Sequence, residues 1–305
     1  MKKHYIKCLI VVDYKTLFIK KFIDYQNPVC YHARDYLKGG GMLLVTEPSK
    51  RLAYCPVQKS GSTTWMTAFA EMNLIDGREN RSPWGLRKTY FQLIRQEYSI
   101  YAGTYQDMDK LNNLPSLRFL FVRHPFYRLA SCYQMINTEK KFLRIIGNYQ
   151  LNHMNFEGNE LAYTKSFISF STFVEFILHE AQNKNASFDS ISNYSPEAIH
   201  WWPYTELCGV CRVHYDLVGH METFNDDLQH LIEKFPDIEV LKKIKEEEYV
   251  KSVNWHGYKG NRTDYMDFFR QVKRVETEKL YNRFKNDFEF GGYDYPYDFI
   301  EAGLE

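Results

Sequence analysis

The sequence predicts an α/β protein with a central parallel sheet flanked by helices, because it contains two strand–turn–helix units. Short apolar runs at 51–57 and 118–122 predict strands, and the second is continuously apolar after its first residue, as expected of a strand buried on both faces. A turn and then a segment of helical periodicity follow each run, at 65–72 and 126–136. Two such units favour parallel strands joined by crossover helices.

The remaining elements follow from periodicity and from turn residues. Helices are expected at 167–180, 224–235, 238–251 and 270–284, a strand at 215–218, and a surface loop at 183–193. Residues 1–45 look irregular, and residues 298–305 form a tail. The stretch 46–297 is therefore expected to be one domain with a single main core.

Composition and charge limit the classes of function. Aromatic residues make up 17% of the chain, and such rings serve both packed cores and sugar-binding clefts, of which a core role is the more frequent. The net charge is +1, so no global field attracts nucleic acid or an acidic membrane. Any anion site has to be local, which argues against a protein that simply coats polyanions.

The cysteines do not form the pattern of a disulfide-rich scaffold. There are six in 305 residues, and only Cys208 and Cys211 have suggestive spacing. A second pair of this spacing is missing, so a four-cysteine zinc site is unsupported. The pair reads equally as a local disulfide, a redox pair or two buried thiols.

The N-terminus begins with basic residues and a short apolar run, Cys8–Val12. Asp13 and Lys15 interrupt this run, which is shorter than the roughly 20 apolar residues of a membrane span or the roughly 7–15 of a signal sequence. This segment therefore shows no convincing anchor. Asn-x-Ser/Thr sequons give weak support for a lumenal setting and begin at Asn80, Asn185, Asn193 and Asn261.

The turn after the first predicted strand has the features of an anion site. Free N–H groups at a helix start attract anions, and Gly61 allows close approach of the backbone. Lys59 places a cation at the strand end, ahead of the glycine, so the pattern is not that of a nucleoside-triphosphate P-loop. The alternative is an ordinary polar loop. The candidate ligand-binding residues are Lys59, Ser60, Gly61, Ser62, Thr63, Thr64 and Trp65.

The turn after the second predicted strand offers a guanidinium. Arg123 leaves a buried strand, where an unpaired charge is costly, and arginine suits bidentate recognition of phosphate. Pro125 stands where the following helix begins, a position at which proline is tolerated. Ser131 lies more than one turn into that helix and is expected to point back to the same site. The alternative is a structural ion pair for Arg123 and a surface position for Ser131.

Together these two units resemble the sulfotransferase fold family, which has a P-loop-like α/β fold. The first resembles its 5′-phosphosulfate loop, and the second resembles its Arg-x-Pro-Phe-x-Arg-Leu-x-Ser segment, which binds a 3′-phosphate. The stretch 200–223, with its Trp-Trp-Pro and Cys-Gly-Val-Cys sequences, and the stretch 280–293 are similar to Golgi carbohydrate sulfotransferases of the chondroitin, dermatan and HNK-1 type. The resemblance covers about residues 50–295.

This resemblance implies transfer of a sulfuryl group from PAPS (3′-phosphoadenosine-5′-phosphosulfate) to a glycan hydroxyl, within a catalytic domain at 46–297. It implies that Lys59 stabilises the leaving 5′-phosphate, which the N–H groups of 61–64 hold. Arg123 and Ser131 would hold the 3′-phosphate. Lys259 lies in a basic loop that would close over this phosphate, and the alternative is a solvated surface loop. Neither a metal nor a nucleic-acid partner is implied.

The resemblance also leaves the general base open. Heparan 2-O-type relatives carry a base histidine in a His-Gly-His segment, where this chain reads Ala102-Gly-Thr104. His200 is our first candidate instead, with His124 and Glu222 as weaker ones. The family setting is a Golgi lumen reached through a membrane anchor, although the sequence shows no convincing span. In that oxidising compartment Cys208 and Cys211 are expected to pair.

Three competing hypotheses follow from the same residues. A nucleotide kinase lacks support because the chain has no Walker lysine and no magnesium-ligand pattern. An inactive relative that binds nucleotide or glycan is opposed only by the presence of Lys59, Arg123 and Ser131. A sulfotransferase for tyrosine or for a small molecule is disfavoured by resemblance alone.

Overall fold

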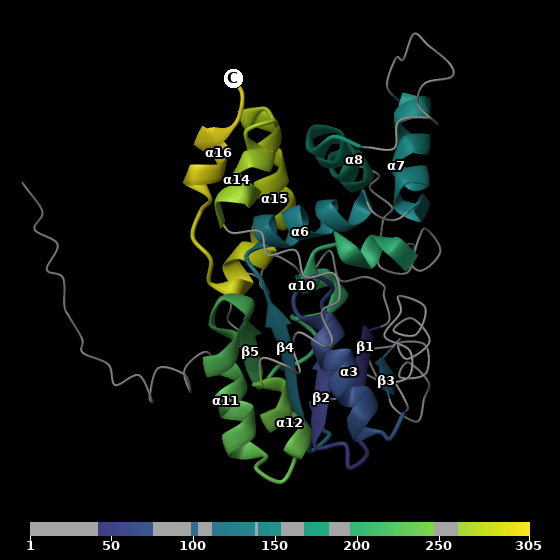
Figure 1. Ribbon diagram of the computed structural model, residues 1–305, viewed down its shortest axis with the longest axis vertical. Coiled ribbons are helices and arrows are strands. Elements are labelled where there is room, and N and C mark those ends of the chain that lie inside the picture. Colours follow the sequence, from purple (N-terminus) through teal and green to yellow (C-terminus); the bar gives the residue numbers. More distant parts are fainter. Residues whose placement is uncertain are drawn as a thin grey trace, which may run out of the picture.

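A mixed β-sheet forms the lower half of the computed structural model, and a layer of helices lies above it (Figure 1). The structure describes residues 42–75, 99–102, 112–137, 140–153, 168–182, 196–246 and 262–305. Within these residues the strand order is β3-β1-β2-β4-β5. The strands are β1 (Met42–Thr46), β2 (Leu52–Cys55), β3 (Ser99–Ala102), β4 (Leu117–Val122) and β5 (Leu217–His220).

The predicted parallel sheet is confirmed for three neighbouring strands, β2, β4 and β5. Their register places Cys55 opposite Leu120 and Val122 opposite His220, so all three carboxyl ends reach one edge of the sheet. Ligands of open α/β sheets bind at this edge. The turns that follow β2, β4 and β5 therefore converge.

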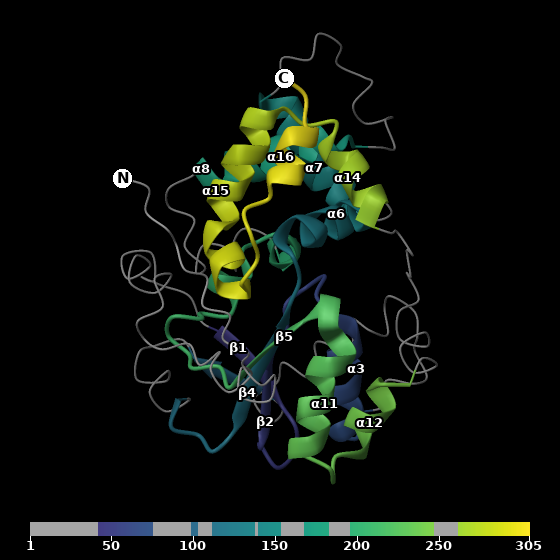
Figure 2. The same cartoon turned by 90° about the vertical axis from the view of Figure 1, so that its left-hand side faces the viewer.

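One face of the sheet is covered by α3 (Ser62–Met72), α11 (Phe224–Lys234) and α12 (Glu239–Ile244), as Figure 2 shows. Trp65 and Phe69 of α3 pack on Phe119 and Phe121 of β4, and all four side chains are fully buried. The opposite face carries a smaller core, in which Leu120 packs with residues of α10 (Tyr204–Leu207) and the stretch after it. The helix-on-sheet burial explains why β2 and β4 are apolar on both faces.

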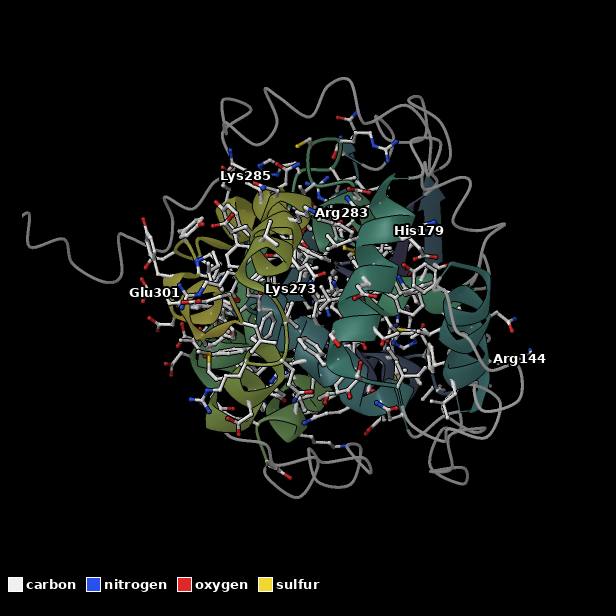
Figure 3. All side chains as sticks on the ribbon, turned by 90° about the horizontal axis from the view of Figure 1, so that it is seen from above. Arg144, His179, Lys273, Arg283, Lys285 and Glu301 are labelled. Atoms are coloured by element: carbon white, nitrogen blue, oxygen red, sulfur yellow. A yellow bond between two sulfur atoms is a disulfide. The ribbon has the colours of Figure 1, made fainter. Side chains whose placement is uncertain are left out.

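The upper helical layer builds on α6, whose buried face begins directly after β4. Seen from above, α15, α8 and α7 lie side by side (Figure 3). The ranges are α6 (Pro125–Ile136), α7 (Lys140–His153), α8 (Phe170–Gln182), α14 (Arg262–Phe269), α15 (Arg274–Gly291) and α16 (Tyr297–Ala302), with two short 3-10 helices, η2 (Pro196–His200) and η3 (Met221–Thr223). Phenylalanine rings fill this core, among them Phe126, Phe269 and Phe299.

The structure differs from the sequence prediction at the edges of the fold. Residues 42–45 were expected to be irregular but belong to β1, which runs antiparallel to β2 and β3 and makes the sheet mixed. The helix expected at 270–284 is α15, which begins at Arg274 and continues to Gly291. The expected tail at 298–305 contains most of α16, which packs on α15. The predicted loop 183–193 lies outside the described residues. Among the helices that are described, none combines the length and the apolar character needed to cross a bilayer.

Candidate active site

The β2–α3 turn (Gln58–Gly61) leaves the carboxyl end of β2 and aims a helix N-terminus at the edge of the sheet. Its backbone bends twice into the left-handed region, at Lys59 (φ 67°) and Gly61 (φ 75°). The first hydrogen bond of α3 runs from Trp65 N–H to the carbonyl of Gly61 (3.2 Å). The N–H groups of 61–64 precede that bond, so they face outward as donors for an anion.

Gly61 is required here for two separate reasons. Its positive φ is costly for a residue with a Cβ. In addition, a Cβ at this position would lie 2.9 Å from Sδ of Met221, which follows β5. The turn after β5 thus packs directly against the β2–α3 turn.

The hydroxyl side chains of this turn and of α3 differ in whether they already have a hydrogen-bond partner. Ser62 donates its hydroxyl to Oε1 of Gln58 (2.9 Å), Thr63 is half-buried and Thr64 is buried. The hydroxyl of Ser60 is buried and has no hydrogen-bond partner within the part of the chain that is described. A buried hydroxyl of this kind is costly unless a ligand pairs with it.

Trp65 combines a core position with an indole N–H that has no hydrogen-bond partner among the described residues. Its indole is fully buried, with ring centroids 4.8 Å from Phe119 and 5.1 Å from Phe121, and its backbone N–H already bonds within α3. The indole therefore anchors α3 in the core, and the expected role of Trp65 in ligand binding stays a prediction.

The β4–α6 turn (Arg123–His124) ends the neighbouring strand. The guanidinium of Arg123 donates to the hydroxyl of Tyr265 on α14 (3.2 Å) and lies 5.3 Å from the centre of that ring. Among the described residues it has no carboxylate partner, so the alternative of a structural ion pair finds no support there. Ser131 is half-buried on α6.

His124 and Glu222, the weaker base candidates, both serve to hold this turn. Glu222 accepts the backbone N–H of His124 (3.0 Å) and the hydroxyl of Tyr293 (2.9 Å). Desolvation, and then the nearby Glu222 carboxylate, raise the pKa of Tyr293 well above its usual value. The His124 ring lies among aromatic rings, 5.0 Å from Phe288. These contacts fit structural roles.

His200 lies at the end of η2, in a segment (196–211) that one buried arginine joins to the β2–α3 turn. Arg128 of α6 donates through Nε to the carbonyl of Gln58 (2.9 Å), and through Nη1 and Nη2 to those of Trp202 (2.7 Å) and Ile199 (3.1 Å). The ring of His200 is half-buried and lies edge-on to Phe142 at 5.4 Å. The structure thus brings the backbone beside His200 to the backbone beside Lys59.

Asp287 of α15 fixes the next part of the same segment. It accepts the backbone N–H groups of Tyr204 (2.9 Å) and Thr205 (3.0 Å) and the Thr205 hydroxyl (2.6 Å). Desolvation raises the pKa of Asp287 to about 6, against the opposing effects of these hydrogen bonds and of Arg128. The carboxyl is fully buried, so it stabilises the start of α10 at a cost in desolvation.

The disulfide prediction was wrong in its pairing. Cys208 bonds to Cys55 at the end of β2, with the two Cα atoms 6.0 Å apart, and Cys211 is also disulfide-bonded but not to Cys208. Gly209, at φ 51°, turns the chain between the two cysteines, and Cys208 faces the sheet. The disulfide therefore joins the 196–211 segment to the end of β2, immediately before the β2–α3 turn.

Two of the remaining predicted positions escape a structural test. Lys259 and Thr104 lie outside the described residues. Ala102 ends the edge strand β3, opposite Met42. Arg128 and Asp287 lie within the stretches described above, but their roles could not be predicted, because their partners are backbone groups that no residue type reveals.

The geometry describes an α/β protein with two anion-ready turns on adjacent parallel strands, and the comparisons with known proteins agree. A profile described as "Sulfotransferase family" matches residues 43–295, and the chain belongs to this family.

Similar proteins include carbohydrate sulfotransferase 11 of Mus musculus, which is 26% identical over 273 residues that cover 83% of this chain and 67% of the relative. Carbohydrate sulfotransferase 10 of Xenopus laevis is 24% identical, with 81% and 66% covered, and carbohydrate sulfotransferase 12 of Mus musculus is 24% identical, with 83% and 60% covered. The chain thus spans about two thirds or less of the length of these relatives. No solved structure gives a significant match.

Proposed function

We propose that the protein is a carbohydrate sulfotransferase that moves a sulfuryl group from PAPS to a hydroxyl of a glycan. One observation carries the proposal: the β2–α3 and β4–α6 turns leave adjacent parallel strands at the same edge of the sheet. Two anion sites at the ends of neighbouring strands suit a nucleotide with phosphate at both its 5′ and 3′ positions.

The chemistry of the two turns fits such a donor. The N–H groups of 61–64 and the unpaired hydroxyl of Ser60 provide donors for the 5′-phosphosulfate. Arg123 has a tyrosine hydroxyl as its recorded partner, so its remaining N–H groups suit a 3′-phosphate, with Ser131 on the following helix. This second site would make the protein selective for PAPS over nucleotides that lack the 3′-phosphate.

Lys59 is the residue we assign to charge stabilisation. Transfer of this type relies on positioning and on neutralising charge, by analogy with phosphoryl transfer. Negative charge grows on the oxygen that leaves with the 5′-phosphate. A compact ammonium held by a left-handed backbone at the strand end is suited to meet it.

His200 remains our proposed base for the acceptor proton. Two other groups are less suitable, since Glu222 accepts two hydrogen bonds and the His124 ring is enclosed by aromatic side chains. The link through Arg128 supports His200, because it brings the η2 backbone toward the β2–α3 turn.

The acceptor class and the compartment rest on different grounds. The relatives are named carbohydrate sulfotransferases, which favours a sugar hydroxyl. The disulfides of Cys55 and Cys211 favour an oxidising compartment, in agreement with the Golgi lumen of the resembled enzymes. Membrane association belongs to that family setting and is part of the proposal only.

Labelled PAPS and a panel of desulfated glycans test the proposal. We expect sulfate transfer to at least one glycan, and calorimetric binding of the product PAP (3′-phosphoadenosine 5′-phosphate). PAP binding without any transfer would indicate an inactive nucleotide-binding relative, and transfer to tyrosine or a small molecule would correct the acceptor. A folded protein with no affinity for PAP would refute the proposal.

A further inference from the structure

Arg128 is a buried cation that the proposed chemistry does not use. Its side chain is 1% exposed, and its recorded acceptors are three backbone carbonyls, those of Gln58, Ile199 and Trp202. A buried charge is expensive without compensation, so these dipoles are essential to its stability. Desolvation lowers the pKa of Arg128, partly offset by Asp287.

The three acceptors come from two regions that are far apart in sequence. Gln58 precedes Lys59 in the β2–α3 turn, and Ile199 precedes His200 in η2. Because the guanidinium is a rigid planar fork, its bonds keep the two carbonyl oxygens within about 8 Å of each other. Each end of the link is therefore one residue away from a group that we assign to the chemistry.

Other contacts also hold the 196–211 segment: the disulfide of Cys208 ties it to Cys55 in β2, and side-chain bonds tie it to neighbouring helices. Trp201 donates to Glu180 of α8 (2.9 Å), and Trp202 donates to Glu206 (2.6 Å). Arg283 of α15 (Figure 3) lies 4.7 Å from the centre of the Trp202 ring and bonds to Glu206. Arg128 differs from these residues because it contacts the turn itself.

We propose that Arg128 is a positioning residue, which sets the place of His200 relative to Lys59 during sulfuryl transfer. This inference rests on the proposed function and adds a further residue to it. Displacement of a reacting group by ~1 Å costs about a hundredfold in rate. Loss of the three-way link should therefore lower kcat much more than it lowers affinity for the nucleotide.

The test compares Arg128→Lys with the native protein and with Arg283→Gln. Lysine keeps the charge but lacks the planar fork, so it does not reach the three carbonyls in their present directions. We expect kcat to fall at least 30-fold, by the rate cost of misplacement, while the Kd for PAP changes less than threefold. Arg283→Gln alters the same segment from the other side and should change kcat less than threefold.

Amide exchange gives a second measurement, which also applies if Arg128→Lys fails to fold. In the native protein, PAP should slow exchange in 199–203 together with 58–64. In Arg128→Lys the protection of 61–64 should persist while that of 199–203 is lost. Protection in the native protein that stays confined to 58–64 would overturn the inference.

Failure of the inference and failure of the proposed function give different results. A native protein that does not bind PAP refutes the sulfotransferase function, and the inference with it. A native protein that binds PAP and transfers sulfate, alongside an equally active Arg128→Lys, refutes the positioning role alone. Equal losses of kcat, PAP affinity and thermal stability would show a purely structural residue, and would also refute it.

Discussion

The two turns at the sheet edge and the 196–211 segment use their polar groups in opposite ways. At the turns, the Ser60 hydroxyl is buried and has no partner in the described part of the chain, where the hydrogen bond of Arg123 goes to a tyrosine hydroxyl. In the segment, Tyr204 and Thr205 bond to Asp287, and both indoles bond to carboxylates. The contrast separates groups available to a ligand from groups that build the scaffold.

This difference teaches how burial and function are related in the protein. Buried polar groups are normally satisfied, so an exception at a candidate anion site, such as the Ser60 hydroxyl, is a place where a bound ligand would supply the missing partner. The same rule identifies Arg128 and Asp287 as charges that fix the position of backbone segments, since both have several backbone partners. Substitutions at the open groups should change binding and rate, whereas substitutions at the satisfied groups should change stability or geometry.

The largest effect is expected at Lys59. Lys59→Ala removes the proposed stabilising charge and should lower kcat by about 1,000-fold, as for loss of one transition-state donor. Lys50→Ala is the matched control, since Lys50 is also a lysine of positive φ (53°) but is exposed in the β1–β2 turn. Steady-state kinetics on both variants decides the matter, and a Lys59→Ala enzyme within threefold of the native rate would remove Lys59 from the mechanism.

The second largest effect is expected at His200, the proposed general base, which lies in the 196–211 segment. His200→Ala should lower kcat by about 100-fold, the lower range for loss of a general base, and leave PAP affinity unchanged. His214→Ala serves as control, because its half-buried ring lies 3.8 Å from Asp216, in a different part of the structure. If His200→Ala retains most of its activity, the base is another group.

Arg123 should affect nucleotide selection more than rate. Arg123→Ala should weaken PAP binding by about 100-fold, from loss of charge-assisted hydrogen bonds to a phosphate. Adenosine 5′-phosphate lacks the 3′ group, so its affinity should change less than threefold. Calorimetry with both nucleotides measures this difference, and Arg270→Ala, an exposed arginine paired with Asp267, is the control. Equal weakening for both ligands would contradict the assignment.

The smallest effect concerns the pH dependence of stability. The folded-state pKa of Asp287 is about 6, above its ordinary value, so the folded protein takes up a proton there. The resulting stabilisation is present below the unfolded pKa of about 4 and is lost as pH rises through 6. From pH 5 to 7 the native protein should lose about 1 kcal/mol more unfolding free energy than Asp287→Asn.

Urea unfolding of both proteins at the two pH values, with disulfides intact, gives this difference directly. Asn282→Asp, an exposed position on the same helix, controls for the general effect of a carboxylate on α15. A difference of the opposite sign would mean that the ionised carboxylate of Asp287 is the stabilised form.

The sequence predicted what depends on local pattern. The apolar runs of β2 and β4 and the small polar residues between strand and helix were sufficient to find the parallel strands and both turns, because burial on two faces and free helix N-termini leave local signals. Lys59, Gly61 and Arg123 were singled out as candidate site residues for the same reason, and their roles stay predictions.

The rest depends on contacts between distant parts of the chain. β1 becomes a strand by pairing with β2 and β3, and its apolar run follows glycines that suggested a loop. The pairing of Cys55 with Cys208 spans 153 residues, so the spacing of Cys208 and Cys211 gave no guide to it. Arg128 was hidden because its acceptors are backbone carbonyls, which any residue can supply.

The bond between Cys55 and Cys208 has a practical consequence for anyone preparing the protein. A disulfide between residues 153 positions apart restricts the unfolded chain, which raises the free energy of unfolding by about 5 kcal/mol at room temperature. Material made in a bacterial cytosol, or purified with dithiothreitol, would lack this restraint behind the nucleotide turn. Secretion from insect or mammalian cells is therefore the better source, and the thiol content of each batch should be titrated before any rate is compared.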